Sequence, residues 1–575
     1  MQDSWRLFNK KADFASIARQ FQIPEPLAVI LCNRGIVTSE AIRKFLYGSL
    51  QDLNDPFLMK GMMEGTQLLA DVIRSDRKIL IIGDYDADGV CAAFILESFL
   101  LEAGAAVGVR IPNRMEEGYG FSPQMAKDAF ADGVSLVITC DNGISAFDAV
   151  SQARELGMSV IVTEHHEPSE KLPEADVVID PKQPEETYPF GELCGAGVAY
   201  RFMQALNQYA DLHLDGLLQE LLAFVAIATV ADVVPLRDEN RILTSEGLQV
   251  LRRTPNPGLN ALVRARGLEL SSIHSEDISF NIAPCINSAG RLRSADMALD
   301  LFRAADMESA WKLAQELSEL NEERKAMTTQ LVEQVLLEMQ EKEKTGLDKI
   351  LVVYLPDAHE SLAGLIAGKL MDRYYRPVLV VTGVSGDLKG SARSTPKCDI
   401  IGTIREHEAL FERSGGHKRA CGFTLKKEGT AEETVKRLSK ALNDSCKMTD
   451  QDLQRKVWVD IALPFSYLNE AFIDCLEMLE PYGAENEKPI FGSSHAYVSD
   501  CYVFGRNRNA LRLQLTDQAG YQAECILFGN EEFLCSERDR IWHQTVTVIF
   551  QLSMNEYRGQ RSPKVTIQGI RICPV

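Results

Sequence analysis

Three aspartates at alternate positions are the first residues whose types and spacing could do chemistry. Asp84, Asp86 and Asp88 follow the apolar run 79–82 and precede Gly89 and a helical pattern. Such a run is typical of a buried strand, and open α/β sheets bind ligands beyond the carboxyl ends of their strands. Carboxylates this close repel one another unless a cation offsets their charge, and dense oxygen ligands favour Mg²⁺ or Mn²⁺. An isolated pattern of this kind is as often a solvated turn.

Two later apolar runs lead into residues of the same kind. One ends at Asp141, and the next ends at the triplet Glu164, His165 and His166. A further strand is expected at 107–112, and helical patterns separate all of these runs. Alternating strands and helices predict a doubly wound parallel sheet, whose strands all end at one edge. We therefore expect the acidic and histidine residues to converge there.

Asp232 is a fourth candidate for the same site. It follows the apolar stretch 221–231, which is too short to cross a membrane and predicts a buried helix. Each group alone would be an ordinary turn, loop or capping residue. Together, carboxylates and imidazoles favour Mn²⁺ over Mg²⁺ and are numerous enough for two ions that share one carboxylate. Two such ions assist in-line displacement at phosphorus.

These segments resemble the four motifs of the DHH phosphoesterase superfamily. The four motifs are residues 84–89, 141–143, 164–166 and 230–232. Residues 287–291 resemble the family's Asn-Ala-Ala-Gly-Arg segment, 390–393 and 415–417 resemble signatures of the superfamily's associated second domain, and 481–491 resembles the start of a C-terminal OB-fold. The resemblance covers most of the chain after residue 79 and points to the superfamily's single-stranded-DNA-specific 5′ exonucleases.

The resemblance implies a role for each matching residue. The implied metal ligands are Asp86, Asp88, Asp141, His165 and Asp232, with Asp141 as the bridge between two Mn²⁺ or Mg²⁺ ions. The implied catalytic residues are Asp84, Glu164 and His166. The implied contacts to a terminal 5′ phosphate are Arg291, Ser391 and Arg393, and those to the substrate strand are Gly415, Gly416 and His417.

The chain departs from the family pattern at three places. Glu164 stands where the family has Asp, which keeps the charge but moves the carboxylate by about one C–C bond; a lost outer contact to a metal ligand typically costs about 10–100-fold. Ser288 replaces an Ala, which we expect to be harmless. Residues 359–364 replace a more glycine-rich segment.

Five regions follow from these patterns. Residues 1–60 form a helical extension, 61–305 the catalytic α/β domain, 306–345 a connecting helix, 346–445 a second α/β domain and 455–575 an OB-fold β-barrel. Aromatic and basic residues interleave in the last region, as in OB-folds that hold single strands. They are Tyr502, Phe504, Arg506, Arg508, Arg512, Tyr557, Arg558 and Arg561. For any one aromatic residue, core packing is an equally good interpretation.

Composition sets broad limits on partners and location. The chain of 575 residues has a net charge of -21, which argues against a nucleic-acid partner but does not exclude one, because binding depends on the local field. Thirteen scattered cysteines without zinc spacing predict a reducing cytoplasm. No signal peptide or transmembrane run is evident, so no membrane association is expected.

The function expected is metal-dependent 5′-to-3′ hydrolysis of single-stranded DNA in repair and recombination. By family resemblance, the partners are single-stranded DNA, a single-strand-binding protein and a helicase. One alternative is a phosphodiesterase of the same superfamily for oligoribonucleotides or cyclic dinucleotides, whose members usually lack a C-terminal barrel. The other is a catalytically silent single-strand-binding scaffold, which Glu164 and the acidic charge would favour.

Overall fold

The computed structural model describes residues 3–113, 117–118, 120–384, 386–557 and 560–573. Two compact units share these residues. One contains Asn287–Met297 and Gln315–Val457, and the other contains Trp5–Ile286, Ala298–Ala314 and Trp458–Val575. Among the described residues, no helix is both long enough and apolar enough to cross a membrane.

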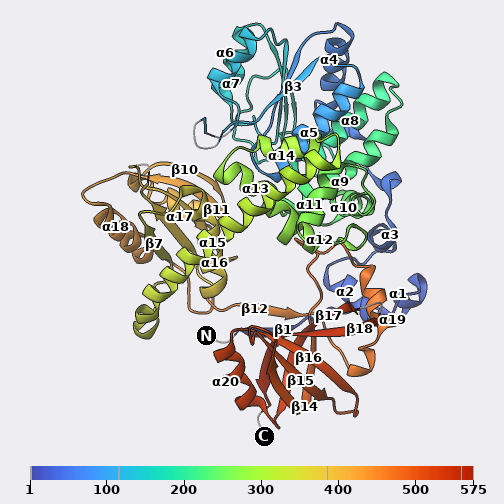
Figure 1. The fold of residues 1–575 in the computed structure, drawn as a ribbon, viewed down its shortest axis with the longest axis vertical. Coiled ribbons are helices and arrows are strands. Elements are labelled where there is room, and N and C mark those ends of the chain that lie inside the picture. The colour runs from blue at the N-terminus through green and yellow to red at the C-terminus, as the bar shows by residue number, and fades with distance from the viewer. Residues whose placement is uncertain (1–2, 114–116, 119, 385, 558–559, 574–575) are drawn as a thin grey trace. The chain divides into compact units, whose positions relative to one another are not determined.

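A five-stranded parallel sheet lies at the centre of the larger unit. Its strands are β2 (Ile79–Ile82), β3 (Val107–Arg110), β4 (Leu136–Cys140), β5 (Ser159–Thr163) and β6 (Val177–Ile179), in the order β3-β2-β4-β5-β6. Every neighbouring pair is parallel, as the alternating pattern predicted. The carboxyl ends of all five strands therefore meet at one edge (Figure 1).

Helices cover both faces of this sheet. On one face, α6 (Pro123–Ala131) and α7 (Phe147–Glu155) bury Met125 and Val150 against the strands. On the other face lie α4 (Met62–Arg74), α5 (Ala87–Glu102) and α8 (Gly195–Ala210). The apolar stretch before Asp232 forms α9 (Asp215–Ala231), a buried helix as predicted. The chain continues as helices: α10 (Asp238–Leu251), α11 (Pro257–Ala265), α12 (Ser275–Asp277), α13 (Ala283–Leu292) and α14 (Asp296–Arg303). The end of α13 and the start of α14, Asn287–Met297, belong to the smaller unit.

The N-terminal segment is not wholly helical, contrary to the prediction. It begins with strand β1 (Ser4–Leu7), followed by α1 (Phe14–Phe21), α2 (Glu25–Asn33) and α3 (Ser39–Tyr47). β1 is a strand because it pairs with β12 (Lys456–Val459), which lies about 450 residues away in the sequence and so leaves no local signal. Leu27 of α2 and Ile42 of α3 share one apolar core with Phe491 and Phe550 of the C-terminal region.

The described C-terminal residues form a six-stranded sheet with two α-helices, α19 (Glu470–Glu477) and α20 (Glu531–Ile541). Its strands are β13 (Ile461–Ala462), β14 (Phe491–Phe504), β15 (Ala510–Thr516), β16 (Gln522–Phe528), β17 (Thr545–Tyr557) and β18 (Gln560–Ile572). β17 pairs with both β18 and β14, so the order β14-β15-β16-β18-β17 returns to its first strand. The β-structure agrees with the predicted OB-fold, and β14, β17 and β18 are its long strands, with 13 or 14 residues each.

The smaller unit contains a second five-stranded sheet, which is mixed. Its strands are β7 (Leu351–Leu355), β8 (Val378–Thr382), β9 (Lys389–Arg393), β10 (Phe411–His417) and β11 (Ala420–Leu425), in the order β10-β11-β9-β8-β7. Its helices are α16 (Ala363–Tyr374), α17 (Ile400–Arg405) and α18 (Ala431–Asp444). The Gly-free and Pro-free segment after Asp306 forms the long helix α15 (Met307–Thr345), as predicted.

Candidate metal centre

The three aspartates after β2 take separate positions at the start of α5. The side chain of Asp86 caps this helix, because its Oδ1 accepts from the backbone N–H groups of Asp88 at 3.0 Å and Gly89 at 3.1 Å. A Cβ at Gly89 would lie 2.6 Å from the Cα of Asp84. Glycine at this position therefore lets the helix start come close to the strand end, and Asp84 and Asp88 are both buried there.

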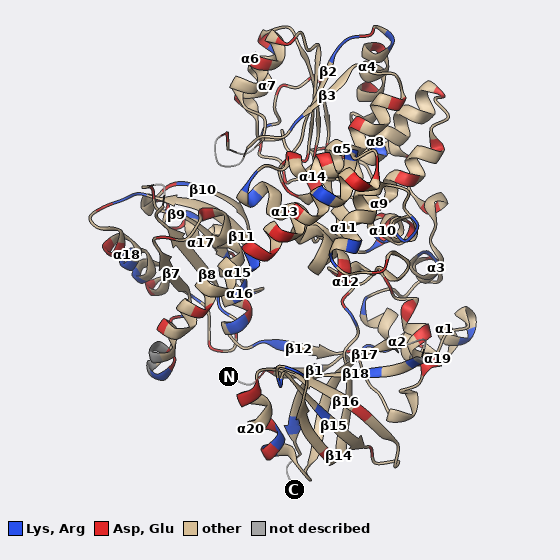
Figure 2. Cartoon of the chain, in the orientation of Figure 1, with Lys and Arg blue, Asp and Glu red and all other residues tan. Residues whose placement is uncertain are grey.

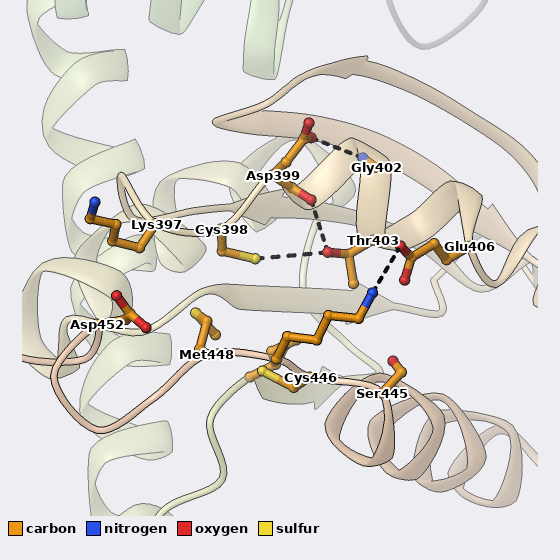
Figure 3. A pocket seen from close by; sticks show the side chains of 12 residues that line it. Lys397, Cys398, Asp399, Gly402, Thr403, Glu406, Ser445, Cys446, Met448 and Asp452 are labelled. Atoms are coloured by element: carbon orange, nitrogen blue, oxygen red, sulfur yellow. Dashed lines mark hydrogen bonds and ion pairs between the residues drawn. The ribbon is translucent and has the colours of Figure 1, made fainter.

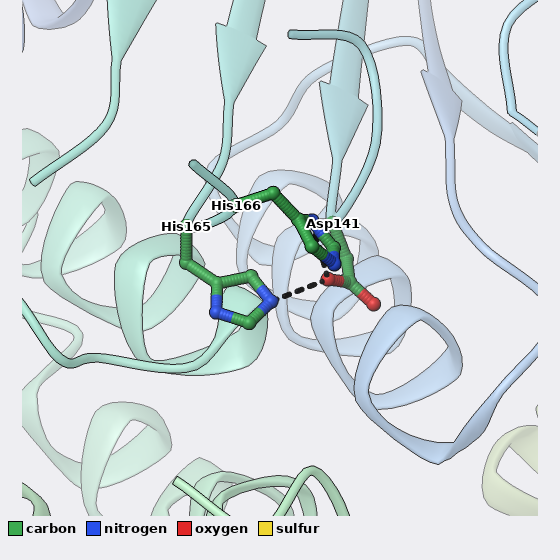
Figure 4. A group of neighbouring side chains, drawn as sticks. All are labelled: Asp141, His165 and His166. Atoms are coloured by element: carbon green, nitrogen blue, oxygen red, sulfur yellow. Dashed lines mark ion pairs between the residues drawn. The ribbon is translucent and has the colours of Figure 1, made fainter. Parts of the chain in front are cut away.

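Asp141 sits at the centre of the strand edge. Its backbone has φ 59°, a left-handed conformation that Asp tolerates better than most residues. Its Oδ1 lies 3.0 Å from Nε2 of His165, and Figure 4 shows the His165 ring pointing at this carboxylate. A Cβ at Gly195 would lie 2.7 Å from the Cβ of Asp141, so only glycine lets the start of α8 pack this closely.

His165 and Asp88 connect this centre to Asp232. Nε2 of His165 lies 3.6 Å from Oδ2 of Asp88, and its Nδ1 lies 3.8 Å from Oδ2 of Asp232. Asp88 accepts from the backbone N–H groups of Gly195 and Ala196 at the start of α8, both at 2.7 Å. The α8 N-terminus therefore fixes the Asp88 carboxylate while each oxygen keeps a further lone pair.

Three overlapping groups of side chains have ligand atoms within 4.8 Å of one another. They are Asp141, His165 and His166; Asp88, His165 and Asp232; and Asp84, Asp86 and Asp141. Asp141 belongs to two of these groups, which is the position the sequence assigned to a bridge between ions. The structure thus brings seven of the eight predicted metal and catalytic residues to one edge, and Glu164, the eighth, contacts His166 there.

The electrostatics of the cluster fit a cation. Burial, followed by repulsion from Asp88 and Asp86, raises the pKa of Asp141 and of Asp232 well above the usual range for a carboxyl. Burial and the Asp86 charge raise the pKa of Asp88 to about 7. Burial lowers the pKa of His165 to about 3, so its imidazole is neutral, which is the form that binds metals. The two ring nitrogens of His165 lie near the carboxylates of Asp88, Asp141 and Asp232.

Glu164 fixes the orientation of the His166 ring. Its Oε2 lies 2.8 Å from Nδ1 of His166 and accepts from the backbone N–H of His165 at 3.0 Å, while its Oε1 accepts from the backbone N–H of Ile144 at 3.3 Å. Burial opposes a charge on His166, but the hydrogen bond and charge of Glu164 outweigh it and raise the pKa of His166 to about 9. The His166 side chain is 47% exposed, so a cationic imidazole faces solvent at this edge.

Two residues at the fifth strand end escaped the sequence analysis. Asp180 follows β6 directly and is fully buried, and burial raises its pKa to about 7. Lys182 lies two positions later. Its positive charge adds to the lowering of the His165 pKa and partly offsets the rise of the Asp232 pKa. Nζ of Lys182 lies 4.0 Å from Oε2 of Glu192. The signal was a three-residue apolar run ending in Asp, which is too short to stand out.

The predicted phosphate contacts lie in the smaller unit, where two arginines meet at one helix start. Nη1 of Arg291 donates to the carbonyl oxygen of Ser361 at 2.9 Å. A Cβ at Gly364 would lie 2.8 Å from Nη2 of Arg393. Ser391 and Arg393 point to the same face of β9, because they are two residues apart in a strand. Two guanidinium groups at the start of the 12-residue helix α16 form a place for an anion.

Gly415, Gly416 and His417 lie on β10, an exposed edge strand of the same sheet. Gly416 has φ 138°, a conformation that favours glycine, and a Cβ there would collide with the β11 backbone. The family resemblance assigned these three residues a contact with the substrate strand but no secondary structure. The structure places these residues, like Ser391, within strands, because pairing with β11 supplies the order that the local sequence lacks.

The aromatic and basic residues of the C-terminal sheet are only partly available to a ligand. Tyr502 is 44% exposed and Phe504 is 37% exposed. The hydroxyl of Tyr502 accepts from Arg512 at 2.8 Å, but Arg512 also pairs with Glu524. Other predicted cations pair with acids too: Arg508 with Glu531 and Arg561 with Asp474. Arg558 lies outside the described residues, and the Tyr557 side chain is not described.

A cavity of about 360 Å³ in the smaller unit contains none of the predicted site residues (Figure 3). Its polar groups largely satisfy one another. Thr403 donates to the backbone oxygen of Asp399 at 2.8 Å, and Lys447 lies 4.0 Å from Glu406. It therefore does not compete with the strand edge as the reactive site.

Comparison with known proteins agrees with this geometry. Family models match residues 78–229 (DHH family, N-terminal domain), 347–447 (DHHA1 domain) and 459–569 (RecJ OB domain). The chain is 34% identical to the single-stranded-DNA-specific exonuclease RecJ of Bacillus subtilis, over 97% of this chain and 69% of the relative. It is 30% identical to RecJ of Dickeya dadantii, over 96% of this chain and 97% of the relative. The crystal structure of RecJ from Thermus thermophilus in complex with Mn²⁺ has a TM-score of 0.82 at 26% identity and covers 100% of this chain and 80% of that chain.

Proposed function

The chain belongs to the RecJ family of single-stranded-DNA-specific exonucleases, and we propose that it removes nucleotides from the 5′ end of single-stranded DNA. The single observation that carries this proposal is the buried edge where carboxylates and a neutral imidazole converge around Asp141. Relatives with this fold are crystallised with Mn²⁺ and with Mg²⁺, and the donor set here suits either cation.

Five side chains would hold the two cations. They are Asp86, Asp88, Asp141, His165 and Asp232. When bound, the cations lower the pKa of a water and offset negative charge on the phosphate oxygens. Asp88, Asp141 and His165 are almost fully buried, so little bulk water reaches their ligand atoms. The start of α8 holds Asp88 in place before any cation binds.

His166 and Glu164 act together on the substrate. A protonated His166 faces solvent and can donate a hydrogen bond from Nε2 to a non-bridging phosphate oxygen, because Nδ1 is engaged by Glu164. Glu164 keeps its contacts to His166 and to the backbone despite being one methylene longer than the family Asp. The substitution therefore leaves the imidazole oriented, which argues against the catalytically silent scaffold.

The 5′ direction comes from the family resemblance, and the arginine pair of the smaller unit offers a place for the terminal phosphate. Arg291 and Arg393, with Ser391, would bind a terminal phosphate, and Gly415, Gly416 and His417 would contact the strand next to it. A doubly ionised terminal phosphate suits two guanidinium groups and a helix start better than an internal phosphodiester does. The C-terminal sheet, matched by the RecJ OB domain model, would hold the strand further along.

We propose a role in DNA repair and recombination, with a single-strand-binding protein and a helicase as partners, since a single-strand exonuclease needs its substrate exposed. A reducing cytoplasm is proposed as its location, because all thirteen cysteines are free and most are buried.

Strands labelled at one end test the polarity. With Mn²⁺ or Mg²⁺, DNA labelled at its 3′ end should shorten progressively, whereas DNA labelled at its 5′ end should release a labelled mononucleotide at once. Chelator and blunt duplex should give no product. Progressive shortening of the 5′-labelled strand would overturn the proposed direction. Faster cleavage of a dinucleotide or cyclic dinucleotide than of a long strand would favour the oligoribonucleotide phosphodiesterase instead.

A further inference from the structure

Two aromatic side chains stack on each other at the small sheet formed by β1 and β12. The rings of Phe8 and Trp458 have centroids 4.7 Å apart and planes inclined by 25°. The backbone N–H of Phe8 donates to the carbonyl oxygen of Val459 at 3.0 Å, which fixes the segment that carries the first ring. The Trp458 residue is nonetheless 44% exposed. An ordered aromatic pair thus presents a large open surface to solvent.

Trp5, three residues before Phe8, adds a third ring. Its indole packs on the backbone of β18, because a Cβ at Gly569 would lie 2.5 Å from its Cζ2. The guanidinium carbon of Arg571 lies 3.9 Å from the centroid of the same indole. Since a strand rises about 3.3 Å per residue, Trp5 and Phe8 are roughly 10 Å apart along the chain. Both rings are held in place before any ligand binds.

The charge around these rings is opposite to that of the whole protein. Residues 4–11 contain Arg6, Lys10 and Lys11 and no acidic residue, although the chain carries a net charge of -21. All three of these cations are exposed. Figure 2 also shows basic colour on β12, which contains Lys456. A local concentration of cations beside exposed rings selects a ligand that is both anionic and able to stack.

We propose that the aromatic strip formed by Arg6, Phe8 and Trp458 is a second binding site for single-stranded DNA. Bases would stack on Phe8 and Trp458, and a phosphate would pair with Arg6. The strip shares no residue with β14 and β15, which carry Tyr502 and Arg512, and the Arg512 cation is paired with Glu524. The inference rests on the proposed function and extends it to how the protein retains a long strand.

Binding in chelator tests the strip without cleavage. The full-length protein would be titrated with fluorescent (dT)30 and (dT)6, comparing wild type with Phe8→Ala/Trp458→Ala. Losing base stacking should weaken (dT)30 binding about 5- to 100-fold and reduce the ratio of (dT)30 to (dT)6 affinity. Trp311→Ala is the matched control, because Trp311 is also exposed, at 39%, and lies outside the strip. The single variant Trp458→Phe should keep most of the wild-type affinity for (dT)30, because an aromatic ring remains at this position.

Equal (dT)30 affinity in wild type and the double variant would overturn the proposal, as would an equal loss in Trp311→Ala. If the double variant fails to fold, as judged by circular dichroism, Trp458→Phe/Arg6→Gln replaces it with the same expectation of weaker long-strand binding. A concentration-dependent dimer that Trp458→Ala abolishes, with DNA affinity unchanged, would assign the strip to a second copy and also overturn the proposal. If wild type with Mn²⁺ cleaves no single-stranded DNA while substitutions in the strip still weaken binding, the exonuclease proposal is refuted and this inference stands.

Discussion

The two five-stranded sheets present functional side chains in different ways. In the parallel sheet β3-β2-β4-β5-β6, the reactive residues follow the strand ends, and Asp88, Asp141 and His165 are almost fully buried. In the mixed sheet β10-β11-β9-β8-β7, they lie within strands, and those of β10 are exposed. The first set is acidic and the second is basic or glycine-rich.

Strand direction explains this difference. Parallel strands all end at one edge, so short polar segments far apart in sequence meet there beneath covering helices, and burial strengthens their charges. Antiparallel strands expose alternate side chains along their length, where solvent and salt weaken each interaction. The parallel edge should therefore respond sharply to single substitutions, and the mixed sheet should respond moderately and depend on salt.

The largest effect is expected at Asp141, which two ligand groups share. Asp141→Asn keeps the shape and suits the left-handed backbone at this position, but it removes the shared charge. Cleavage of single-stranded DNA should fall by more than about 100-fold, beyond the usual loss for an outer contact. Thermal unfolding in chelator should show a higher Tm than wild type, because repulsion is relieved, with little further rise on adding Mn²⁺. Activity within tenfold of wild type would break the contrast between the sheets.

Glu164 is next, because it contacts the cluster only through His166 and backbone groups. Glu164→Gln should weaken Mn²⁺ affinity about 10–100-fold, measured by calorimetry, because a neutral amide orients the imidazole poorly. Glu164→Asp restores the family residue and serves as the control. An Mn²⁺ affinity unchanged in Glu164→Gln would show that the longer side chain has no part in the site.

Arg393 tests the mixed sheet. Arg393→Ala should lower kcat/KM about 10–100-fold on strands with a 5′ phosphate, the value of a lost charge-assisted contact, and little on strands with a 5′ hydroxyl. The difference should shrink as salt rises, unlike the effect at Asp141. Arg373→Ala is the matched control, since Arg373 is an exposed arginine on α16 of the same unit. An equal loss on both kinds of 5′ end would refute the phosphate pocket.

The smallest effect is expected from substituting Asp180, and it concerns the stability of the protein in chelator. Its folded pKa of about 7 lies above its ordinary value of 3.8, so the folded protein retains a proton that the unfolded chain releases. The contribution of Asp180 to the free energy of unfolding should therefore fall as pH rises from about 4 to about 7 and then stay level. Asp180→Asn should match wild type at pH 4 and exceed it at pH 8 by about 1–4 kcal/mol, or several degrees in Tm. A Tm difference independent of pH would exclude a buried charge as the cause.

Much of the parallel edge could be predicted from the sequence, because each part has a local signal. Asp84, Asp141 and Glu164 each follow an apolar run, and the alternation of strands and helices indicated that these ends would meet. Asp180 could not be predicted in this way, since β6 has only three residues. It is a strand because it pairs with β5, which no local pattern records.

The mixed sheet could be predicted less well. Its glycine-rich segments look like loops, and β9 contains Lys, Gly, Ser and Arg, which are poor strand formers. Only pairing with β8 and β11 makes it a strand. The approach of Arg291 and Arg393 to Ser361 and Gly364 likewise joins residues that are roughly 30 to 70 positions apart in the sequence.

The sequence by itself determined the family, the parallel sheet and the identity of its acidic and histidine residues, because hydrophobic periodicity and motif spacing are local properties. The tertiary structure alone decided that Asp141 lies between two ligand groups, that α8 fixes Asp88 and that Trp458 stacks on Phe8. Those facts depend on pairing and packing between segments up to 450 residues apart. Such contacts form only when burial of apolar surface offsets the entropy of bringing distant segments together.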